Sequence, residues 1–213
     1  NKLKAEGLAQ QAKWMMLRYQ VNPHFLFNAL NSIRALIGHD NEKARNIVTK
    51  MSEYFRYSLS IEKKTAVALK EEIDAVENYL EIQKVRYPER LKISKVIDPK
   101  VIDCIIPVFS IQTLIENAIK YGLKTHEGVI DININVENLN EKLKIQISNT
   151  GKLVVSKEKH SEGTNTGLEN LKSRLRFLDK DFQFDLFEQE NKVIASLLLS
   201  KCSKYEDIEN NNS

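Results

Sequence analysis

The amino-acid sequence predicts an α+β protein, in which a helical hairpin that forms a dimeric four-helix bundle is followed by a two-layer α/β sandwich with a mixed sheet. Two observations predict this class. Up to Arg86 the apolar residues recur every three or four positions, which is the helical period, whereas from about Leu91 they alternate with polar residues, as in strands. We therefore expect a helical region over residues 1–88, a mixed domain over 89–203 and a polar tail over 204–213.

Two predicted helices form the hairpin. The stripe of the first is Val21, Phe25, Ala29, Ile33 and Leu36, widened by Leu26, Leu30 and Ile37. After the short link GHDN, Asp40 or Asn41 can cap the second helix. Its stripe is Ala44, Ile47, Met51, Phe55 and Leu59. One hairpin cannot bury stripes this wide but two can, so we predict a homodimer. A third helix is expected from about Lys70 to Arg86.

Strands and helices alternate in the second half of the chain. The spacing predicts strands over 91–97, 129–136, 143–147, 182–187 and 193–199, with hairpin turns at NLNE (138–141) and EQEN (188–191). One helix is expected to have Pro107 in its first turn and to end at Gly122. Another carries Leu168, Leu171, Leu175 and Leu178 on one face, and Arg174 and Arg176 suit its solvated face. This order indicates a two-layer sandwich.

Composition excludes several functions. The 32 basic and 29 acidic residues are mixed along the chain, so no nucleic-acid face is predicted. There is no signal peptide, and no apolar run approaches the roughly 18 residues of a membrane helix. Cys104 and Cys202 have no metal-ligand spacing, and they fit a reducing cytoplasm with Cys104 in the core.

Polar side chains that suit a nucleotide occur on the helix that precedes Gly122. Glu116, Asn117 and Lys120 fall on the side opposite Ile115 and Ala118. An amide oxygen can ligate Mg²⁺ and an ammonium can meet phosphate charge. A solvated polar face is the alternative, and from this helix alone it is the better interpretation.

Two later segments favour a nucleotide site over a solvated polar face. SNTG (148–151) ends a strand with a polar side chain and a glycine, and GTNTGLEN (163–170) is a Gly-containing loop that opens into a helix. Free backbone N–H groups at such a helix start favour an anion. A Gly loop alone is weak evidence, so the order of these segments along the chain matters more.

That order resembles the ATP-binding domain shared by histidine kinases, gyrase and Hsp90, with its N, G1 and G2 boxes. Together with NPHFLFN (22–28) and EIDAVENYLEIQKVRYPERL, the chain resembles the LytS-like sensor histidine kinases over roughly residues 15–200. The resemblance implies an ATP- and Mg²⁺-dependent kinase. Because the first residue is Asn, we expect a fragment of a membrane-anchored parent, located on the cytoplasmic side of the plasma membrane.

The resemblance also implies roles for individual residues. His24 is the phosphoacceptor, Asn117 the Mg²⁺ ligand and Lys120 a phosphate contact, while Glu116 is a candidate for polarising water or the imidazole. The remaining nucleotide contacts are Asn149, Gly151, Gly163, Gly167, Leu168 and Asn170. Two positions depart from the family pattern. Asn149 stands where an Asp usually reads the adenine amino group, which weakens ATP binding, and Asn165 replaces a glycine of the G2 loop.

The stretch NPHFLFN can be interpreted physically in two ways. Pro23 either bends one continuous helix just before His24, which the apolar periodicity upstream favours, or follows Asn22 as the first residue of a new helix. A neutral imidazole is a competent nucleophile near neutral pH. Asn28 lies one turn beyond His24, where its amide can orient a water or steady the imidazole.

The predicted function is autophosphorylation of His24 and transfer of the phosphoryl group to an aspartate of a response-regulator receiver domain. The first alternative is a degenerate, non-catalytic dimeric adaptor, suggested by Asn149 and Asn165. The second is an ATP-hydrolysing switch or a serine kinase of the same ATP-domain superfamily, and neither of these explains NPHFLFN.

Overall fold

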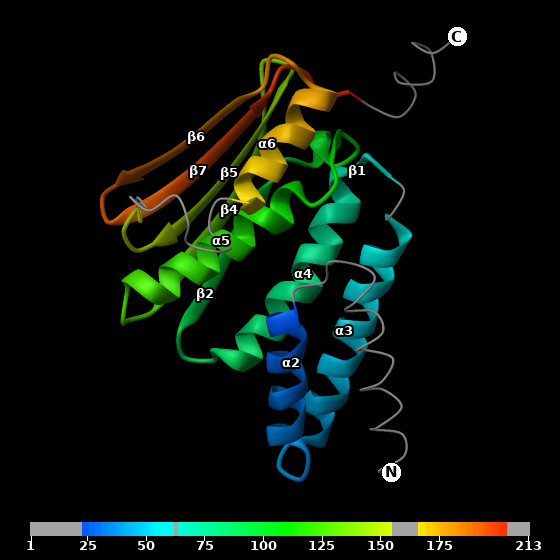
Figure 1. Ribbon diagram of the computed structural model, residues 1–213, viewed down its shortest axis with the longest axis vertical. Coiled ribbons are helices and arrows are strands. Elements are labelled where there is room, and N and C mark those ends of the chain that lie inside the picture. The colour runs from blue at the N-terminus through cyan, green and yellow to red at the C-terminus, as the bar shows by residue number, and fades with distance from the viewer. Residues whose placement is uncertain (1–22, 62–63, 155–165, 204–213) are drawn as a thin grey trace. The chain divides into compact units, whose positions relative to one another are not determined.

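The computed structural model describes residues 23–61, 64–154 and 166–203, which fall into two compact units (Figure 1). One unit contains helices α2 (Pro23–Leu36) and α3 (Asn41–Ser60) and the part of α4 (Leu69–Arg86) from Asn78 onward. The other contains residues 64–68, α4 up to Glu77 and the described residues from Glu89 onward. The domain boundary that the sequence suggests after residue 88 stays a prediction.

Helices α2 and α3 form the predicted antiparallel hairpin (Figure 1). Its buried residues are Phe25, Leu26, Ala29, Ala44, Ile47, Met51 and Tyr54. Phe55 and Leu59, which were expected in the stripe, are only half-buried, and Tyr54 is buried instead. The 3.6-residue period explains this difference, because a stripe spaced strictly by four drifts around the helix.

Three aromatic rings fix the first turn of α2 within this unit. The ring centre of Phe25 lies 5.4 Å from that of Tyr54 and 4.9 Å from that of Tyr79. Gln83 donates a hydrogen bond of 2.8 Å to the hydroxyl of Tyr79. The residue that directly follows His24 is therefore anchored by packing against both α3 and α4.

Asp40 is the cap of α3, and its removal is expected to cost about 1 kcal/mol of stability. The backbone N–H of Lys43 donates to its carboxylate at 2.9 Å, whereas Asn41 accepts instead from the N–H of Gly38. Thermal unfolding of Asp40→Ala, beside His39→Ala as an exposed neighbour, measures this cost. Equal unfolding of both variants would contradict the assignment.

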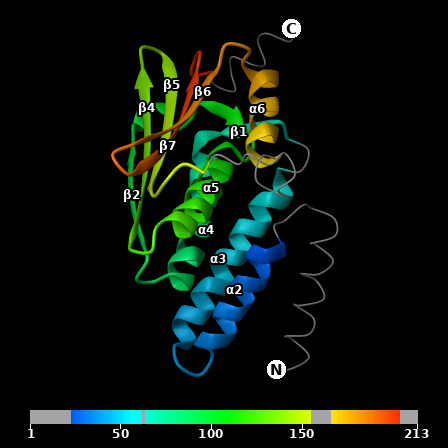
Figure 2. The same ribbon diagram turned by 60° about the vertical axis from the view of Figure 1, so that its left-hand side comes forward.

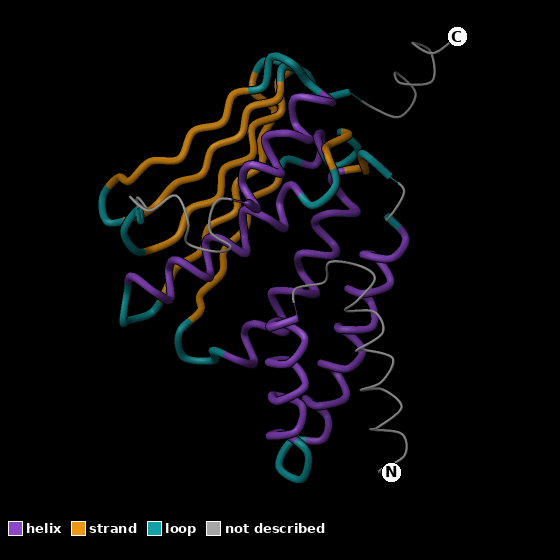
Figure 3. The backbone as a smooth tube through the Cα atoms, in the orientation of Figure 1, coloured by secondary structure: helices purple, strands orange, loops and turns teal. Residues whose placement is uncertain are grey.

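The second unit is a two-layer sandwich with a mixed five-stranded sheet in the order β2-β4-β5-β7-β6 (Figure 3). Strand β2 (Leu91–Ile97) pairs in parallel with β4 (Ile130–Leu139). Strands β5 (Lys142–Thr150), β7 (Lys192–Leu199) and β6 (Gln183–Gln189) continue the sheet by antiparallel pairing. Helices α5 (Ser110–Thr125) and α6 (Thr166–Leu178) cover one face (Figure 2). Alternate residues of β4 and β5 are buried beneath them, which confirms the predicted α+β class with a two-layer sandwich, while the dimeric bundle stays a prediction.

The hairpin turns are tighter than the sequence suggested. Asn140 and Glu141 have φ angles of 52° and 68°, and Glu190 and Asn191 have 50° and 58°. Both connections are therefore two-residue loops with positive φ at each position, the geometry that matches the twist of the strands. The strands run into the segments NLNE and EQEN, which were predicted to be turns.

The predicted start and end of the helix around Asn117 are both wrong. Pro107 ends a short strand, β3 (Ile105–Pro107), which pairs antiparallel with β1 (Ala66–Ala68). Helix α5 begins at Ser110 and continues beyond Gly122 to Thr125. Pro107 suits the strand because, with only one neighbouring strand, its missing N–H leaves no gap in a ladder. A short 3₁₀ helix, Pro99–Val101, also precedes β3.

The two cysteines form a disulfide, which the sequence did not lead us to expect. Cys104 is fully buried, as predicted, but it is joined to Cys202, with the two Cα atoms 5.1 Å apart. Backbone hydrogen bonds hold the same region, since Ile105 donates to Ser203 and Cys202 donates to Glu141. A sequence separation of 98 residues gave no local signal for this pairing.

Candidate functional site

Helix α5 presents the three polar residues that the sequence singled out. Ile115 and Ala118 are buried against the sheet, Glu116 and Asn117 are half-buried, and Lys120 is exposed. The side-chain amide of Asn117 donates to the carbonyl of Thr113 at 2.9 Å. Because this bond uses the Nδ2 group, the Oδ1 atom is the part of Asn117 that can serve as a ligand.

Glu116 is a carboxyl group in a partly desolvated position. Burial raises its pKa, while the side-chain amide of Gln112 and the charge of Lys120 oppose this shift. Gln112 Nε2 donates to Glu116 Oε1 at 2.7 Å, which orients the carboxyl group. An oriented acid with a raised pKa suits proton transfer near neutral pH.

Two glycines bring the end of α5 against the end of β5. A Cβ atom on Gly122 would lie 2.9 Å from the Ile130 side chain and 3.3 Å from Asn149 Nδ2. Gly151 has a φ angle of 137°, and a Cβ atom there would lie 2.4 Å from Thr125 Oγ1. Asn149 is only 3% exposed and donates to the carbonyl of Thr150 at 3.0 Å. We call Gly122, Thr125, Asn149 and Gly151 the glycine cradle.

Sequence reasoning missed Gly122 and Thr125 as members of this cradle. Gly122 was interpreted as a helix terminator, yet it lies inside α5. The Thr125 hydroxyl accepts from the N–H of Lys152 at 3.0 Å and donates to the carbonyl of Tyr121 at 2.8 Å. A glycine inside a helix lowers the stability of the helix by about 1 kcal/mol relative to alanine. Its presence within a helical pattern was therefore the available signal for a close contact.

The first turn of α6 lies beside Thr113 of α5. A Cβ atom on Gly167 would lie 3.6 Å from the Thr113 side chain, and the carbonyl of Thr113 holds Asn117. Leu168 is half-buried and Asn170 is exposed. Gly163 and Asn165 lie outside the described residues. Asn117 and Gly167 thus each neighbour Thr113, whereas Asn149 and Gly151 lie against the C-terminal end of α5.

The phosphoacceptor candidate lies in the other unit. His24 is in the first turn of α2, and its side chain is not among those described. Asn28, one turn later, is half-buried, and its Nδ2 atom is buried without a hydrogen-bond partner in the described part of the chain. The choice between a bend at Pro23 and a cap at Asn22 depends on residues 21 and 22, which lie outside the described residues.

The polar groups of α5 and the glycine cradle are compatible with a metal-bound polyphosphate. They offer an amide oxygen on Asn117, an ammonium on Lys120, and a cradle from which side-chain bulk is excluded. In the described ranges no group of three His, Cys, Asp or Glu residues could hold a metal by itself. A single amide ligand is compatible with Mg²⁺, because this ion keeps several waters and binds few protein groups beside the substrate phosphates.

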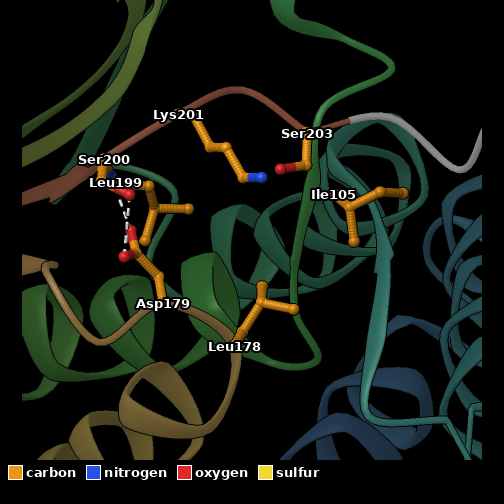
Figure 4. Close-up of a pocket in the computed structure, with 7 residues that line it drawn as sticks. All are labelled: Ile105, Leu178, Asp179, Leu199, Ser200, Lys201 and Ser203. Atoms are coloured by element: carbon orange, nitrogen blue, oxygen red, sulfur yellow. Dashed lines mark hydrogen bonds between the residues drawn. The ribbon is translucent and has the colours of Figure 1, made fainter. Parts of the chain in front are cut away.

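A separate cavity of about 150 Å³ lies between the end of α6 and the end of β7 (Figure 4). Asp179 in its wall accepts from the N–H and the hydroxyl of Ser200, at 2.6 and 2.9 Å. The cavity contains no predicted site residue. Its lining is Ile105, Leu178, Asp179, Leu199, Ser200, Lys201 and Ser203. Because its carboxylate is already hydrogen-bonded, we assign this cavity no role in binding.

Comparison with known proteins first defines the class. Residues 12–91 match the family model described as histidine kinase. The chain is 38% identical over 178 residues to the sensor protein LytS of Staphylococcus saprophyticus, and 33% identical over 183 residues to that of Enterococcus faecalis. Each alignment covers 79% of this chain and 30% of the relative.

A solved structure gives a weaker likeness. The histidine kinase domain of a blue-light activated kinase from Erythrobacter litoralis aligns with a TM-score of 0.48 at 11% identity, covering 92% of this chain and 93% of that chain. The chain is thus similar to LytS sensor proteins over most of its length, and its first part matches the histidine kinase family model. It spans about 30% of the length of those relatives. None of the described helices is long and apolar enough to cross a membrane.

Proposed function

We propose that the chain is the transmitter region of a sensor histidine kinase, which phosphorylates His24 from Mg·ATP and passes the phosphoryl group to an aspartate of a response-regulator receiver domain. The observation that carries this proposal is the arrangement along α5. Asn117 is bonded to the Thr113 carbonyl, Gly167 lies beside the Thr113 side chain, and the glycine cradle is at the C-terminal end. The similarity to LytS sensor proteins and the match to the histidine kinase family model support the kinase activity. A cytoplasmic location beside the membrane is part of the proposal, because ATP is supplied there.

Each residue of the nucleotide site would have a distinct task. Asn117 Oδ1 would hold Mg²⁺, which supplies charge neutralisation on the phosphates, and Lys120 would meet phosphate charge directly. Asn149 donates its amide N–H to Thr150, so its Oδ1 would accept from the adenine amino group. The N–H groups at the start of α6, near Gly167, would face an anion.

His24 would supply the nucleophile. The lone pair of the neutral imidazole forms a bond to the γ-phosphorus while the bond from that phosphorus to the bridging oxygen breaks, leaving ADP. Glu116, oriented by Gln112, would take part in proton handling at the site. Asn28 would steady the imidazole from one turn away, and its Nδ2 has no hydrogen-bond partner within the described residues.

Dimerisation through the hairpin is part of the proposal. Phe27, Ile37 and Val48 are large apolar side chains on α2 and α3 or the link between them, and they are 58%, 62% and 40% exposed. Such residues are usually covered in the functional assembly when they extend the apolar face of a hairpin. A second copy of the hairpin would complete a four-helix bundle.

Labelling with γ-labelled ATP tests the proposal. The wild-type chain with Mg²⁺ is expected to acquire acid-labile label, as a phosphohistidine does, whereas His24→Gln and Asn117→Ala are expected to acquire none. Nucleotide binding should survive in His24→Gln and weaken in Asn117→Ala. Acid-stable label, or label that persists in His24→Gln, would contradict the assignment of His24.

A non-catalytic dimeric adaptor is the second candidate. Asn149 favours it, since a neutral amide makes a hydrogen bond about half as strong as a carboxylate does. The adaptor would bind neither ATP nor its analogues measurably and would remain dimeric. Absence of both labelling and nucleotide binding in the wild-type chain would favour this function.

A further inference from the structure

A buried carboxylate joins α4 to the beginning of the nucleotide helix α5. Glu72, in the first turn of α4, is 1% exposed and accepts hydrogen bonds from the backbone N–H groups of Phe109 and Ile111, the latter at 2.9 Å. Phe109 is the N-cap residue of α5, with a φ angle of 59°, and it supplies no capping side chain. The first N–H groups of a helix carry partial positive charge and lack intrahelical partners. Glu72 therefore caps α5 from another helix.

Arg174 brings a third helix to the same place. The sequence suggested a solvated helix face for this residue, but its Nε atom is buried and has no hydrogen-bond partner in the described ranges. Its guanidinium carbon lies 6.0 Å from the centre of the Phe109 ring. Burial lowers the pKa of Arg174, and the charge of Glu72 opposes that shift. Arg174 is therefore half-buried, where the sequence suggested a solvated face, and its charge lies in the field of the buried Glu72 carboxylate.

We propose that Glu72 and Arg174 are positioning residues for the nucleotide site. Glu72 holds the N-terminus of α5 on α4, and Arg174 ties α6 to the same carboxylate. This role rests on the proposed function, because the groups that they would position are the candidate nucleotide contacts. Helix α5 carries Glu116 and Asn117, and α6 has Gly167 in its first turn. Neither residue is among those expected to touch the nucleotide.

The placement of Glu72 on α4 gives this pair a wider consequence. Helix α4 is continuous from Leu69 to Arg86, and its residues from Asn78 onward belong to the unit that contains α2 and α3. Glu72 thus anchors the candidate nucleotide helix to an element that both units share. A loss of the cap would alter nucleotide binding without any change in the residues that bind it.

Amide hydrogen exchange in the nucleotide-free chain tests the cap directly. The segment 108–117 is expected to exchange roughly tenfold faster in Glu72→Gln and Arg174→Met, the loss expected when a charge-assisted hydrogen bond is weakened. Arg174→Lys keeps the charge and should remain near wild type. Asp74→Asn and Arg176→Met change exposed residues on the same two helices and should leave the exchange unaltered.

Affinity for a non-hydrolysable Mg·ATP analogue then tests the positioning role. Glu72→Gln and Arg174→Met are each expected to weaken binding by about tenfold. The double variant is expected to lose much less than the product of the two single losses, because both residues act through one contact. Arg174→Lys should restore most of the affinity, which a merely structural defect would not predict.

Three results would overturn the inference: unchanged exchange in Arg174→Met, equal effects of Arg174→Met and Arg176→Met, or multiplicative losses in the double variant. If Glu72→Gln fails to fold, the comparison of Arg174→Met with Arg176→Met still tests whether Arg174 supports the cap of α5. If the wild-type chain binds no analogue, the proposed function fails, while the exchange data on the nucleotide-free chain decide the Glu72–Arg174 contact separately.

Discussion

Gly122→Leu is expected to lower the nucleotide affinity of the chain by at least about tenfold and its stability by roughly 1–3 kcal/mol. The position has no room for a side chain, because a Cβ atom would already lie 2.9 Å from the Ile130 side chain and 3.3 Å from the backbone carbonyl of Thr150. A backbone carbonyl in a paired strand cannot rotate away. The end of α5 must therefore move off β5, which separates Asn149 and Gly151 from the rest of the glycine cradle.

A core variant separates the affinity effect from simple destabilisation. Val136 is buried near the other end of β4 from the cradle, and Val136→Ala should cost stability of similar size through the lost burial. It is expected to leave analogue binding unchanged. Titration calorimetry and thermal unfolding of both variants make the comparison. If Gly122→Leu binds the analogue as tightly as Val136→Ala does, then the contact of α5 with β5 has no part in the nucleotide site.

The elements that the sequence predicted are those that local patterns determine. Strand 91–97 was predicted with its observed bounds, because the apolar period changes there and the strand forms one edge of the sheet. The helical hairpin followed from stripes of apolar residues and a short polar link. Each of these signals is carried within a window of fewer than about 20 residues, which is the range over which hydrophobic periodicity is informative.

The features that the sequence did not predict depend on contacts between distant segments. Pro107 has a sequence context that suits a helix start, but pairing with Ala66 places it in a strand. Cys104 is bonded to Cys202, and the charge of Arg174 interacts with that of Glu72. Both pairs are far apart in the sequence, so no local pattern predicts them. The same holds for the glycine cradle. Asn149 and Gly151 were singled out by resemblance to a family, whereas Gly122 required the three-dimensional contact with β4 and β5.

Glu116→Gln is expected to make the nucleotide-free chain more stable at neutral pH while it lowers the rate of His24 labelling by roughly a hundredfold or more. Burial raises the pKa of Glu116, so the folded state favours the protonated carboxyl group. A raised pKa contributes stability that is complete below the ordinary value of about 4.5 and is lost as the pH rises through the folded-state value. At pH 7 the buried charge of Glu116 therefore lowers the stability of the wild-type chain, and a glutamine carries no such charge.

The neighbouring side chain favours the same outcome. Gln112 already donates to Glu116, and its own Oε1 atom is buried without a hydrogen-bond partner in the described residues. The new amide of Glu116→Gln can donate to that oxygen, so the substitution adds a hydrogen bond as it removes a charge.

Thermal unfolding in chelator at pH 7 and below pH 4.5 checks the sign, with a gain of a few degrees expected at pH 7 and none at the lower pH. Glu127→Gln, an exposed change in the same unit, should alter neither stability nor labelling. A destabilised Glu116→Gln at pH 7 would mean that the Glu116 carboxylate is held by favourable contacts as a structural group. A stabilised variant that labels normally would remove Glu116 from the transfer step. Higher stability together with lost labelling is the result expected of a catalytic residue. Such residues often destabilise the fold, because active sites retain buried charges that a core optimised for stability would lack.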